Sequence, residues 1–414
     1  MIKSLAFSLG LLSATALVTP ASAGSGGTLQ IMVSKDTQQM VVYDGGQVVA
    51  TSKVSTGKQG HTTPSGIFSI LEKKKYHESN LYSNAPMPWM QRITWSGVAL
   101  HESNSVPNYP ASHGCVRMPG DFAKALFQMT ERGAHVIITD KPVVPVSISH
   151  ATLFKPTAGT EPGQLLSDAQ LRPGNIETGK NPVEVAMIDV LPKAGAKATV
   201  ALNDLPPVRI LITRRGERET ILDMQGLLNE LGFDAGVPDG HTGRLTVSAI
   251  NGFKRWKGLS TGGTLISAEM LTALYKAAGK GEPPAGQILV RQAFKPMFEA
   301  PIGISSPEIA LGTHFIEATD VNRYSGKAEW HTVSLENHLS PATLKRLGIT
   351  VPADDTAMFD ASHALDRITI PADIRARIEA MLGEGSSITI SDTGIGQETG
   401  PGTDFITITR KKPA

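Results

Sequence analysis

Short apolar runs separated by polar and turn-forming residues dominate residues 27–140. The runs expected to form β-strands are residues 29–33, 40–43, 48–55, 66–70, 94–100 and 135–139. Asp44-Gly45-Gly46 marks a hairpin between two of them. Only residues 121–130 repeat apolar positions at helical spacing. The pattern predicts a mainly antiparallel β domain with one or more helices.

Residues 141–207 break this pattern, because prolines and glycines are frequent there and hydrophobic periodicity is weak. Such a stretch is typical of an extended, partly structured linker. Residues 183–190 have the composition of a strand that docks on a neighbouring domain. We therefore predict a Pro-rich linker between two folded parts of the chain.

Helical periodicity begins at Arg218. The first apolar face comprises Ile221, Leu222, Met224, Leu227, Leu228 and Leu231. Gly232 suits the C-terminal end of that helix, and Thr246 and Ser267 suit the N-caps of two further short helices. These features predict a small three-helix module at residues 208–280.

The last part of the chain, residues 281–414, mixes strands at residues 387–391 and 404–409 with a helix near residues 372–382. We predict an α+β region there and assign it no role. A length of 414 residues exceeds what one hydrophobic core usually organises. The predicted fold is therefore multidomain: a mainly-β domain, a three-helix module and a C-terminal α+β region.

Charge and the N-terminus narrow the function classes. Hydrophobic residues make up 40%, charged residues 19%, and the formal net charge is +1, which fits a globular chain and gives no support for a nucleic-acid partner. Lys3, the apolar run at residues 5–18 and Ala21-Ser22-Ala23 predict a signal peptide at residues 1–23. The run is shorter than the roughly 20 residues of a spanning helix. We expect an exported protein without a stable transmembrane anchor.

Cys115 is the only cysteine, so no intrachain disulfide can form. A lone cysteine is more often apolar filler than a reactive group, but His101 and His113 lie close to it in the sequence. An attacking thiol needs a base, and either imidazole titrates in the right range. Gly114 allows close backbone approach, and the N–H groups of Gly114 and Cys115 are expected to form an oxyanion hole. These residues predict a nucleophilic thiol that forms a thioester, which an amine or water then resolves.

Other interpretations of the same residues remain. His101, His113 and Cys115 have the residue types of zinc ligands, but a structural zinc site needs four and a fourth is not evident. No metal or other cofactor is therefore expected. Arg117 is either a surface charge or a binder of a substrate carboxylate. Ser112 is either a turn residue or part of the site.

The run Ser112-His113-Gly114-Cys115-Val116-Arg117-Met118 resembles the catalytic domain of the L,D-transpeptidases, of the YkuD type. His101 upstream and Thr63-Pro64-Ser65-Gly66-Ile67-Phe68 add to the resemblance, which covers residues 27–140. It implies an enzyme of the bacterial periplasm or cell wall that remakes peptidoglycan. The thiolate attacks between the third and fourth residues of a tetrapeptide stem, releases the terminal D-alanine and passes the acyl group to an amine of a neighbouring stem, giving 3-3 cross-links.

The resemblance also implies roles for individual residues. His101 is the base for Cys115, and the backbone carbonyl of Glu102 orients its imidazole. His113 shapes the site and donates a hydrogen bond, while Ser112 and Arg117 are expected to bind substrate. Glutamate at position 102 departs from the family, in which a small residue is more common.

Residues 218–278 resemble a small peptidoglycan-binding module. The supporting residues are Gln225, Leu228, Leu231-Gly232-Phe233, Asp239-Gly240, Gly243, Thr246, Ala249-Ile250, Phe253 and Gly258-Leu259. Lys254 and His241 depart from the pattern, in which glutamine and an aromatic residue are usual. The resemblance implies the glycan and stem peptides of peptidoglycan as partners; the alternative is a helical spacer.

The sequence therefore favours an exported cysteine acyltransferase acting on peptidoglycan. A hydrolase on the same substrate is the first alternative, because both use the same thioester. A non-catalytic wall-binding scaffold is the second. The acyl acceptor and the oligomeric state are not encoded in any pattern found in the sequence.

Overall fold

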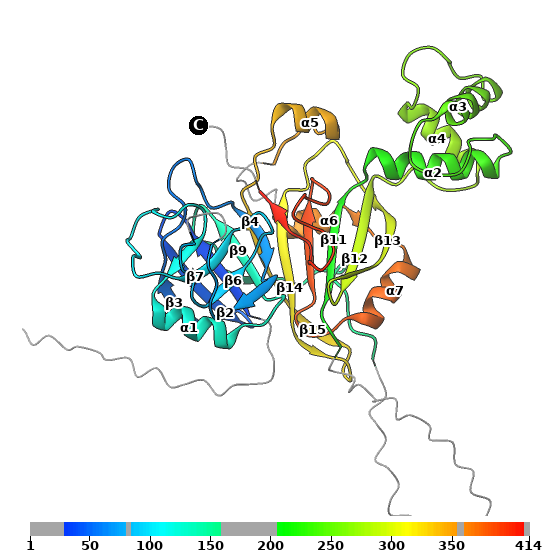
Figure 1. Ribbon diagram of the computed structural model, residues 1–414. Helices are drawn as coiled ribbons and strands as arrows, with labels where there is room; N and C mark the ends of the chain where they lie inside the picture. Colours follow the sequence, from blue (N-terminus) through cyan, green and yellow to red (C-terminus); the bar gives the residue numbers. More distant parts are fainter. Residues whose placement is uncertain (1–28, 80–83, 159–204, 354–359, 410–414) are drawn as a thin grey trace, which may run out of the picture.

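The computed structural model describes residues 29–79, 84–158, 205–353 and 360–409. The predicted signal peptide at residues 1–23 and the strand considered at residues 183–190 lie outside this part of the chain. Figure 1 shows a β-rich N-terminal domain, a second and larger sheet beside it, and a helical module at the far edge of that sheet. The multidomain prediction is confirmed. Within the described residues, no helix is both long and apolar enough to cross a membrane.

Two sheets build the N-terminal domain. Its elements in chain order are β1 (Gln30–Ser34), β2 (Gln39–Asp44), β3 (Gln47–Lys53), β4 (Gly66–Ser69), β5 (Glu72–Lys74), β6 (Met90–Arg92), β7 (Ala99–Glu102), β8 (Val116–Met118), α1 (Gly120–Met129) and β9 (His135–Thr139). The larger sheet has the order β18-β4-β9-β1-β2-β3, in which β18 (Thr407–Ile408) comes from the end of the chain, and the smaller has the order β5-β6-β7-β8. The pairs β1 with β9 and β7 with β8 are parallel, and the remaining pairs of these two sheets are antiparallel.

The predicted hairpin and helix of this domain are present, but one predicted strand is displaced. Gly45 and Gly46 adopt φ of +52° and +80° between β2 and β3, as a two-residue hairpin turn requires. Residues 94–100 were expected to form a strand, whereas β7 begins only at Ala99. A turn precedes it, because the Thr94 hydroxyl accepts the N–H of Val98 at 2.9 Å.

The larger sheet of the N-terminal domain is buried on both faces. Ile31 and Val33 of β1 face the core shared with α1, while Met32 faces the opposite way. That opposite face packs against the second domain through Met32, Tyr43, Ile67, Ile137, Phe315, Val333 and Leu335. Burial on both sides explains why β1 and β9 are continuous apolar runs.

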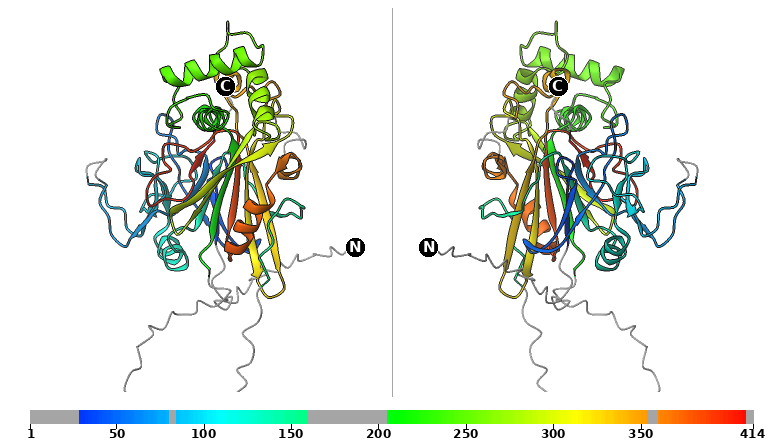
Figure 2. Two further views of the ribbon diagram at one scale, coloured as in Figure 1. Left: turned by 90° about the vertical axis from the view of Figure 1, so that its right-hand side faces the viewer. Right: turned by 90° about the vertical axis from the view of Figure 1, so that its left-hand side faces the viewer.

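The second domain is an eight-stranded sheet in the order β10-β15-β14-β17-β11-β12-β13-β16. Its elements are β10 (Val146–Ser147), β11 (Val208–Arg214), β12 (Gly286–Gln292), β13 (Lys295–Ile304), β14 (Thr313–Asn322), β15 (Lys327–Leu335), α5 (Pro341–Leu347), α6 (Ala361–Asp366), β16 (Ile368–Thr369), α7 (Ala372–Met381) and β17 (Ser387–Ser391). Ile374 and Ile378 of α7 pack on Ile210 and Ile388 of the sheet. Figure 2 shows α7 on the side of the sheet away from the N-terminal domain.

The helical module is an insertion in the second domain. α2 (Glu217–Glu230), α3 (Arg244–Trp256) and α4 (Ala268–Ala277) lie between β11 and β12, which pair with each other. β11 was expected to belong to the module; its seven buried residues instead make it a central strand. The linker predicted for residues 141–207 is also partly folded, because Leu153 and Phe154 are buried in the core of the second domain. Residues 159–204 lie outside the described part.

The end of the chain returns to the N-terminal domain. β18 (Thr407–Ile408) pairs with β4 and extends its sheet. Gly66 permits this pairing, because a Cβ at that position would lie 2.2 Å from the carbonyl oxygen of Thr407. Arg209 ties the same region together by donating to Asp404 at 3.4 Å and to the Gly133 carbonyl at 2.9 Å. The C-terminal region is therefore built into the N-terminal domain.

Candidate active site

The smaller sheet brings Cys115 and His101 to one face. β7 and β8 are parallel neighbours, with Leu100 opposite Val116 and His101 opposite Arg117. Side chains alternate along a strand, so Cys115, one position before β8, shares a face with Arg117 and His101. Leu100 and Val116 point to the other face and into the core.

The imidazole of His101 is buried and fixed in one tautomer. Its Nδ1 lies 2.7 Å from the Glu102 carbonyl oxygen, as the resemblance implied, so Nδ1 carries the proton and Nε2 is free to accept one. Burial lowers the pKa of His101 to about 4, and the charge of Arg117 also lowers it. The imidazole is therefore neutral near pH 7.

Glutamate at position 102 does not disturb this geometry. A Cβ placed on Gly120 would lie 3.2 Å from the carboxyl carbon of Glu102, so that side chain extends toward the first residue of α1. A carboxylate near a helix N-terminus is favourable. The Glu102 carbonyl remains directed at His101.

The thiol of Cys115 is half-buried and uncharged at rest. Sγ lies 3.6 Å from the Gly97 carbonyl oxygen and packs beside Met87, Met90 and Ala99. Burial raises the pKa of Cys115, although the N–H of Ala99 and the charge of Arg92 oppose that effect. Sequence inspection did not identify Gly97, because it lies within the stretch that was expected to be a strand.

The turn before Cys115 is held by its own hydroxyl group. Ser112 is 1% exposed, and its Oγ accepts the Gly114 N–H at 3.1 Å and donates to the Cys115 carbonyl at 2.5 Å. The prediction that the Gly114 N–H is free for an oxyanion hole is therefore wrong, because this N–H donates to Ser112 Oγ. Gly114 has φ of +121°, which is the conformational reason for glycine here.

Thr63 links this turn to the neighbouring loop. It is fully buried, and its Oγ1 donates to the Gly114 carbonyl at 2.7 Å while accepting the Gly57 N–H at 2.8 Å. The sequence pointed to Thr63 only as part of a motif, without indicating which atoms it contacts. Its place in the structure is that of a positioning residue for the Gly114–Cys115 peptide.

His113 and Arg117 lie at the exposed side of the site. The ring of His113 meets that of His61 edge-on, with centroids 4.8 Å apart. Partial desolvation and the charge of Lys58 lower the pKa of His113. Arg117 is half-buried, and its charge lowers the pKa values of His101, His113 and Cys115. No group of three or more His, Cys, Asp or Glu side chains in the described residues is arranged to hold a metal ion.

Several residues of the peptidoglycan-binding motif have structural roles within the helical module. Gln225 is buried and closes the loop before α3: its Nε2 donates to Asp239 Oδ1 at 3.0 Å and its Oε1 accepts the Gly240 N–H at 2.9 Å. Thr246, expected to be an N-cap, lies inside α3, and Gly243 occupies the cap. Lys254 is 2% exposed and donates to the Thr264 carbonyl at 2.9 Å, so this departure from the family pattern is a folding contact.

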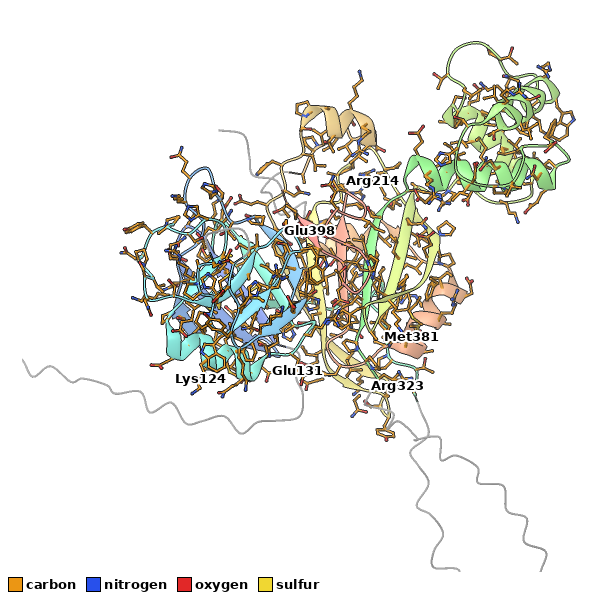
Figure 3. The ribbon with its side chains drawn as sticks, in the orientation of Figure 1. Lys124, Glu131, Arg214, Arg323, Met381 and Glu398 are labelled. Atoms are coloured by element: carbon orange, nitrogen blue, oxygen red, sulfur yellow. The ribbon has the colours of Figure 1, made fainter. Side chains whose placement is uncertain are left out.

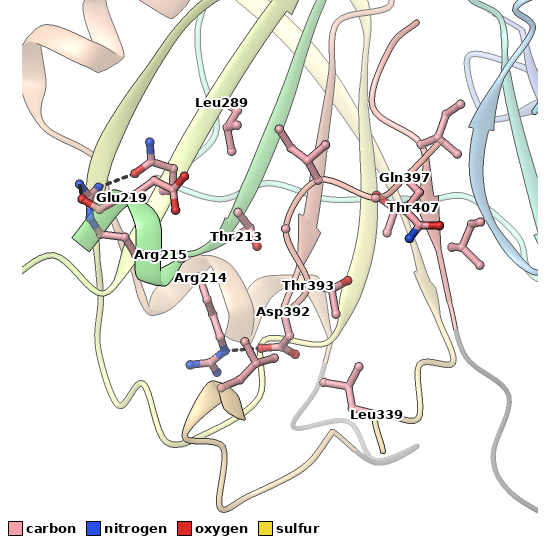
Figure 4. Close-up of a pocket in the computed structure, with 18 of the residues that line it drawn as sticks. Thr213, Arg214, Arg215, Glu219, Leu289, Leu339, Asp392, Thr393, Gln397 and Thr407 are labelled. Atoms are coloured by element: carbon pink, nitrogen blue, oxygen red, sulfur yellow. Dashed lines mark hydrogen bonds and ion pairs between the residues drawn. The ribbon is translucent and has the colours of Figure 1, made fainter. Parts of the chain in front are cut away.

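A large cavity lies elsewhere in the described part of the chain. It has a volume of about 1040 Å³ and is bounded by Thr213 and Leu289 of the eight-stranded sheet, the loop after β17 and β18. Figure 4 shows the ion pair of Arg214 and Asp392 in its wall, with Nε 2.7 Å from Oδ1. Cys115 and His101 do not line it.

Comparison with known proteins gives two family matches and several relatives. The model of the L,D-transpeptidase catalytic domain, YkuD, matches residues 29–138, and that of a putative peptidoglycan binding domain matches residues 217–265. A putative L,D-transpeptidase, YqjB of Bacillus subtilis (strain 168), is 31% identical over an alignment of 144 residues that covers 30% of this chain and 80% of that protein.

Solved structures of L,D-transpeptidases also match. The enzyme from Mycobacterium smegmatis is 24% identical, with 28% of this chain and 59% of that chain covered and a TM-score of 0.26. The enzyme from Xylanimonas cellulosilytica DSM 15894 is 28% identical, with 28% and 62% covered and a TM-score of 0.25. The chain thus spans less than two thirds of the length of these structures.

Proposed function

Since the chain belongs to the L,D-transpeptidase family, we propose that it is an exported cysteine acyltransferase that cross-links peptidoglycan stem peptides. The observation that carries the proposal is the shared face of β7 and β8, on which Cys115 and His101 lie. The unprotonated Nε2 of His101 supports its role as the base. No cofactor is required for this chemistry.

The first half-reaction forms a thioester. Cys115 Sγ attacks the carbonyl carbon of the third stem residue while His101 Nε2 takes the thiol proton. The bond to the terminal D-alanine then breaks, and His101 returns that proton to the departing amine. Because the thiol pKa is raised and the imidazole pKa is low, the proton moves as the carbon–sulfur bond forms rather than beforehand.

The second half-reaction resolves the thioester. An amine of a neighbouring stem attacks the acyl carbon and gives a proton to His101. The carbon–sulfur bond then breaks, and His101 passes that proton to the leaving sulfur, which restores the thiol. We assign the oxyanion contact to the Cys115 N–H, because the Gly114 N–H is already used by Ser112. Arg117 supplies a cation for a substrate carboxylate, and His113 donates a hydrogen bond at the exposed side of the site.

The helical module adds a second contact with the wall. The peptidoglycan-binding domain match supports peptidoglycan as the partner of this module. A module that holds the enzyme on its polymer raises the effective concentration of stem peptides at Cys115. We propose that export, directed by residues 1–23, places the protein in the periplasm or at the cell wall.

Incubation with purified disaccharide-tetrapeptides tests the transferase proposal. We expect mass spectrometry to show dimers joined through third residues, together with released D-alanine. Monomers shortened by one residue without dimers would instead identify a hydrolase. Intact peptides alone, together with wall binding, would favour the non-catalytic scaffold.

A Thr63→Val variant is expected to acylate about tenfold more slowly, because it keeps the side-chain volume but loses both hydrogen bonds of Oγ1. Thr63→Ser retains the hydroxyl and should stay close to the wild type. Intact-mass measurement of the acyl-enzyme against time gives the rate. Equal rates for Thr63→Val and the wild type would show that this bridge does not position the Gly114–Cys115 peptide.

A further inference from the structure

The turn between β6 and β7 is held from outside by the C-terminal part of the chain. Glu398 Oε2 accepts the N–H of Trp95 at 2.8 Å and lies 3.4 Å from the N–H of Ser96, across a separation of 303 residues for the first pair. Figure 3 shows Glu398 where the two domains meet. One carboxylate thus engages two successive N–H groups of the turn.

The same turn carries the carbonyl that meets the thiol. Gly97 has φ of +110°, and its carbonyl oxygen lies 3.6 Å from Cys115 Sγ. The Thr94 hydroxyl fixes the inner end of the turn by accepting the N–H of Val98 at 2.9 Å. Glu398 fixes the outer end, so Gly97 lies between two anchored points.

Glu398 is itself held in place by both domains. Before it, Asp392 pairs with Arg214 at 2.7 Å. After it, the Thr399 hydroxyl accepts the N–H of Ile406 at 2.8 Å, just ahead of β18 in the N-terminal sheet. The loop is therefore anchored on both sides of Glu398.

We propose that Glu398 is a positioning residue for the nucleophile: by holding the N–H groups of Trp95 and Ser96, it places the Gly97 carbonyl against Cys115 Sγ and fixes the direction of the thiol. This gives the C-terminal region, so far without a role, a part in the active site. The inference rests on the proposed function only where turnover is measured.

The thiol provides a direct readout, because Cys115 is the only cysteine. A carbonyl acceptor stabilises S–H relative to thiolate. Loss of Glu398 should therefore shift alkylation of Cys115 toward lower pH. The other ionisable groups that face the thiol, His101 of β7, Arg92 of β6 and Arg117 of β8, are unchanged in the variants.

The experiment compares Glu398→Ala, Glu398→Gln and the control Glu282→Ala, which removes an exposed carboxylate. Iodoacetamide alkylation against pH and kinetics with a disaccharide-tetrapeptide are measured on the full chain, with thermal unfolding as a check on folding. For Glu398→Ala we expect the lower-pH alkylation profile and about a tenfold fall in kcat with KM within about twofold. Glu398→Gln keeps an acceptor oxygen and should recover most of kcat.

The inference is overturned if the alkylation profile and kcat of Glu398→Ala match those of Glu282→Ala. A lower unfolding temperature with an unchanged alkylation profile would overturn it too, since that result describes a purely structural contact. If the wild type does not turn over the disaccharide-tetrapeptide, the proposed function fails separately. The alkylation comparison then still decides the role of Glu398.

Discussion

Replacing Cys115 by alanine is expected to lower thioester formation and cross-linking at least about 10³-fold, because the chain has no second thiol to take over the attack. Cys115 is half-buried, so we expect the smaller side chain to leave the fold intact. Dimer formation from disaccharide-tetrapeptides measures the loss. Intact-mass analysis after exposure to a carbapenem measures the same residue independently, with one adduct on the wild type and none on Cys115→Ala.

Wall binding is the control for this variant. The helical module lies in a separate part of the chain, so Cys115→Ala should still sediment with purified peptidoglycan as the wild type does. Cys115→Ser tests the chemistry further, because a hydroxyl is far less acidic than a thiol, and the lowered pKa of His101, about 4, makes its imidazole a weak base. Cross-linking by Cys115→Ala at the wild-type rate would contradict the thiol mechanism.

Local patterns predicted most elements, but not which ones meet. The run at residues 29–33 was expected to be a strand, yet nothing in it indicates that Phe315 of a distant strand covers its second face. Residues 94–98 contain Thr94, Trp95 and Val98, which favour strands, but Ser96-Gly97 between them favours a turn. They form a turn because Thr94 and Glu398 take their N–H groups. Local hydrogen bonds within the turn, together with the contact from Glu398, outweighed the strand propensity of the flanking residues there.

The assignment of β11 failed for a related reason. Val208–Arg214 is a buried strand by pattern, but its neighbour β12 lies beyond the inserted helices. Proximity in sequence therefore suggested the wrong domain. An insertion can separate two paired strands in the sequence, and neither strand then carries a pattern that identifies its partner.

The residue types in the sequence were sufficient to locate the candidate site. They were not sufficient to predict its hydrogen bonds. Cys115 with a nearby histidine follows from the need of a thiol for a base. The choice of His101 over His113, and its orienting contact with Glu102, were implied by the resemblance. The Gly114 N–H was misjudged because the rotamer of Ser112 is not encoded in the motif. The contact from Glu398 depends on how the whole chain folds back.

Substitution of His101 by alanine is expected to slow acylation about 10²- to 10⁴-fold near pH 7, since that is the usual contribution of a general base. The effect should depend on pH in a defined way. The pKa of His101 is about 4, so the wild-type base is available at every pH above that value. In His101→Ala the reaction depends instead on the fraction of Cys115 present as thiolate, which is small because burial raises the pKa of the thiol. Its rate should therefore climb with pH, and the gap to the wild type should narrow.

His113→Ala is the matched control, because His113 also lies near Cys115 in the sequence but is exposed, whereas His101 is buried with its Nδ1 on the Glu102 carbonyl. His113 is exposed and contacts His61, so its loss should cost no more than about tenfold. Acylation rates from pH 5 to 9 for both variants decide the assignment. A large, pH-dependent loss in His113→Ala with a small one in His101→Ala would transfer the base to His113. A loss in His101→Ala that is constant across this range would make His101 a structural contact, because only a proton acceptor loses its advantage as thiolate accumulates.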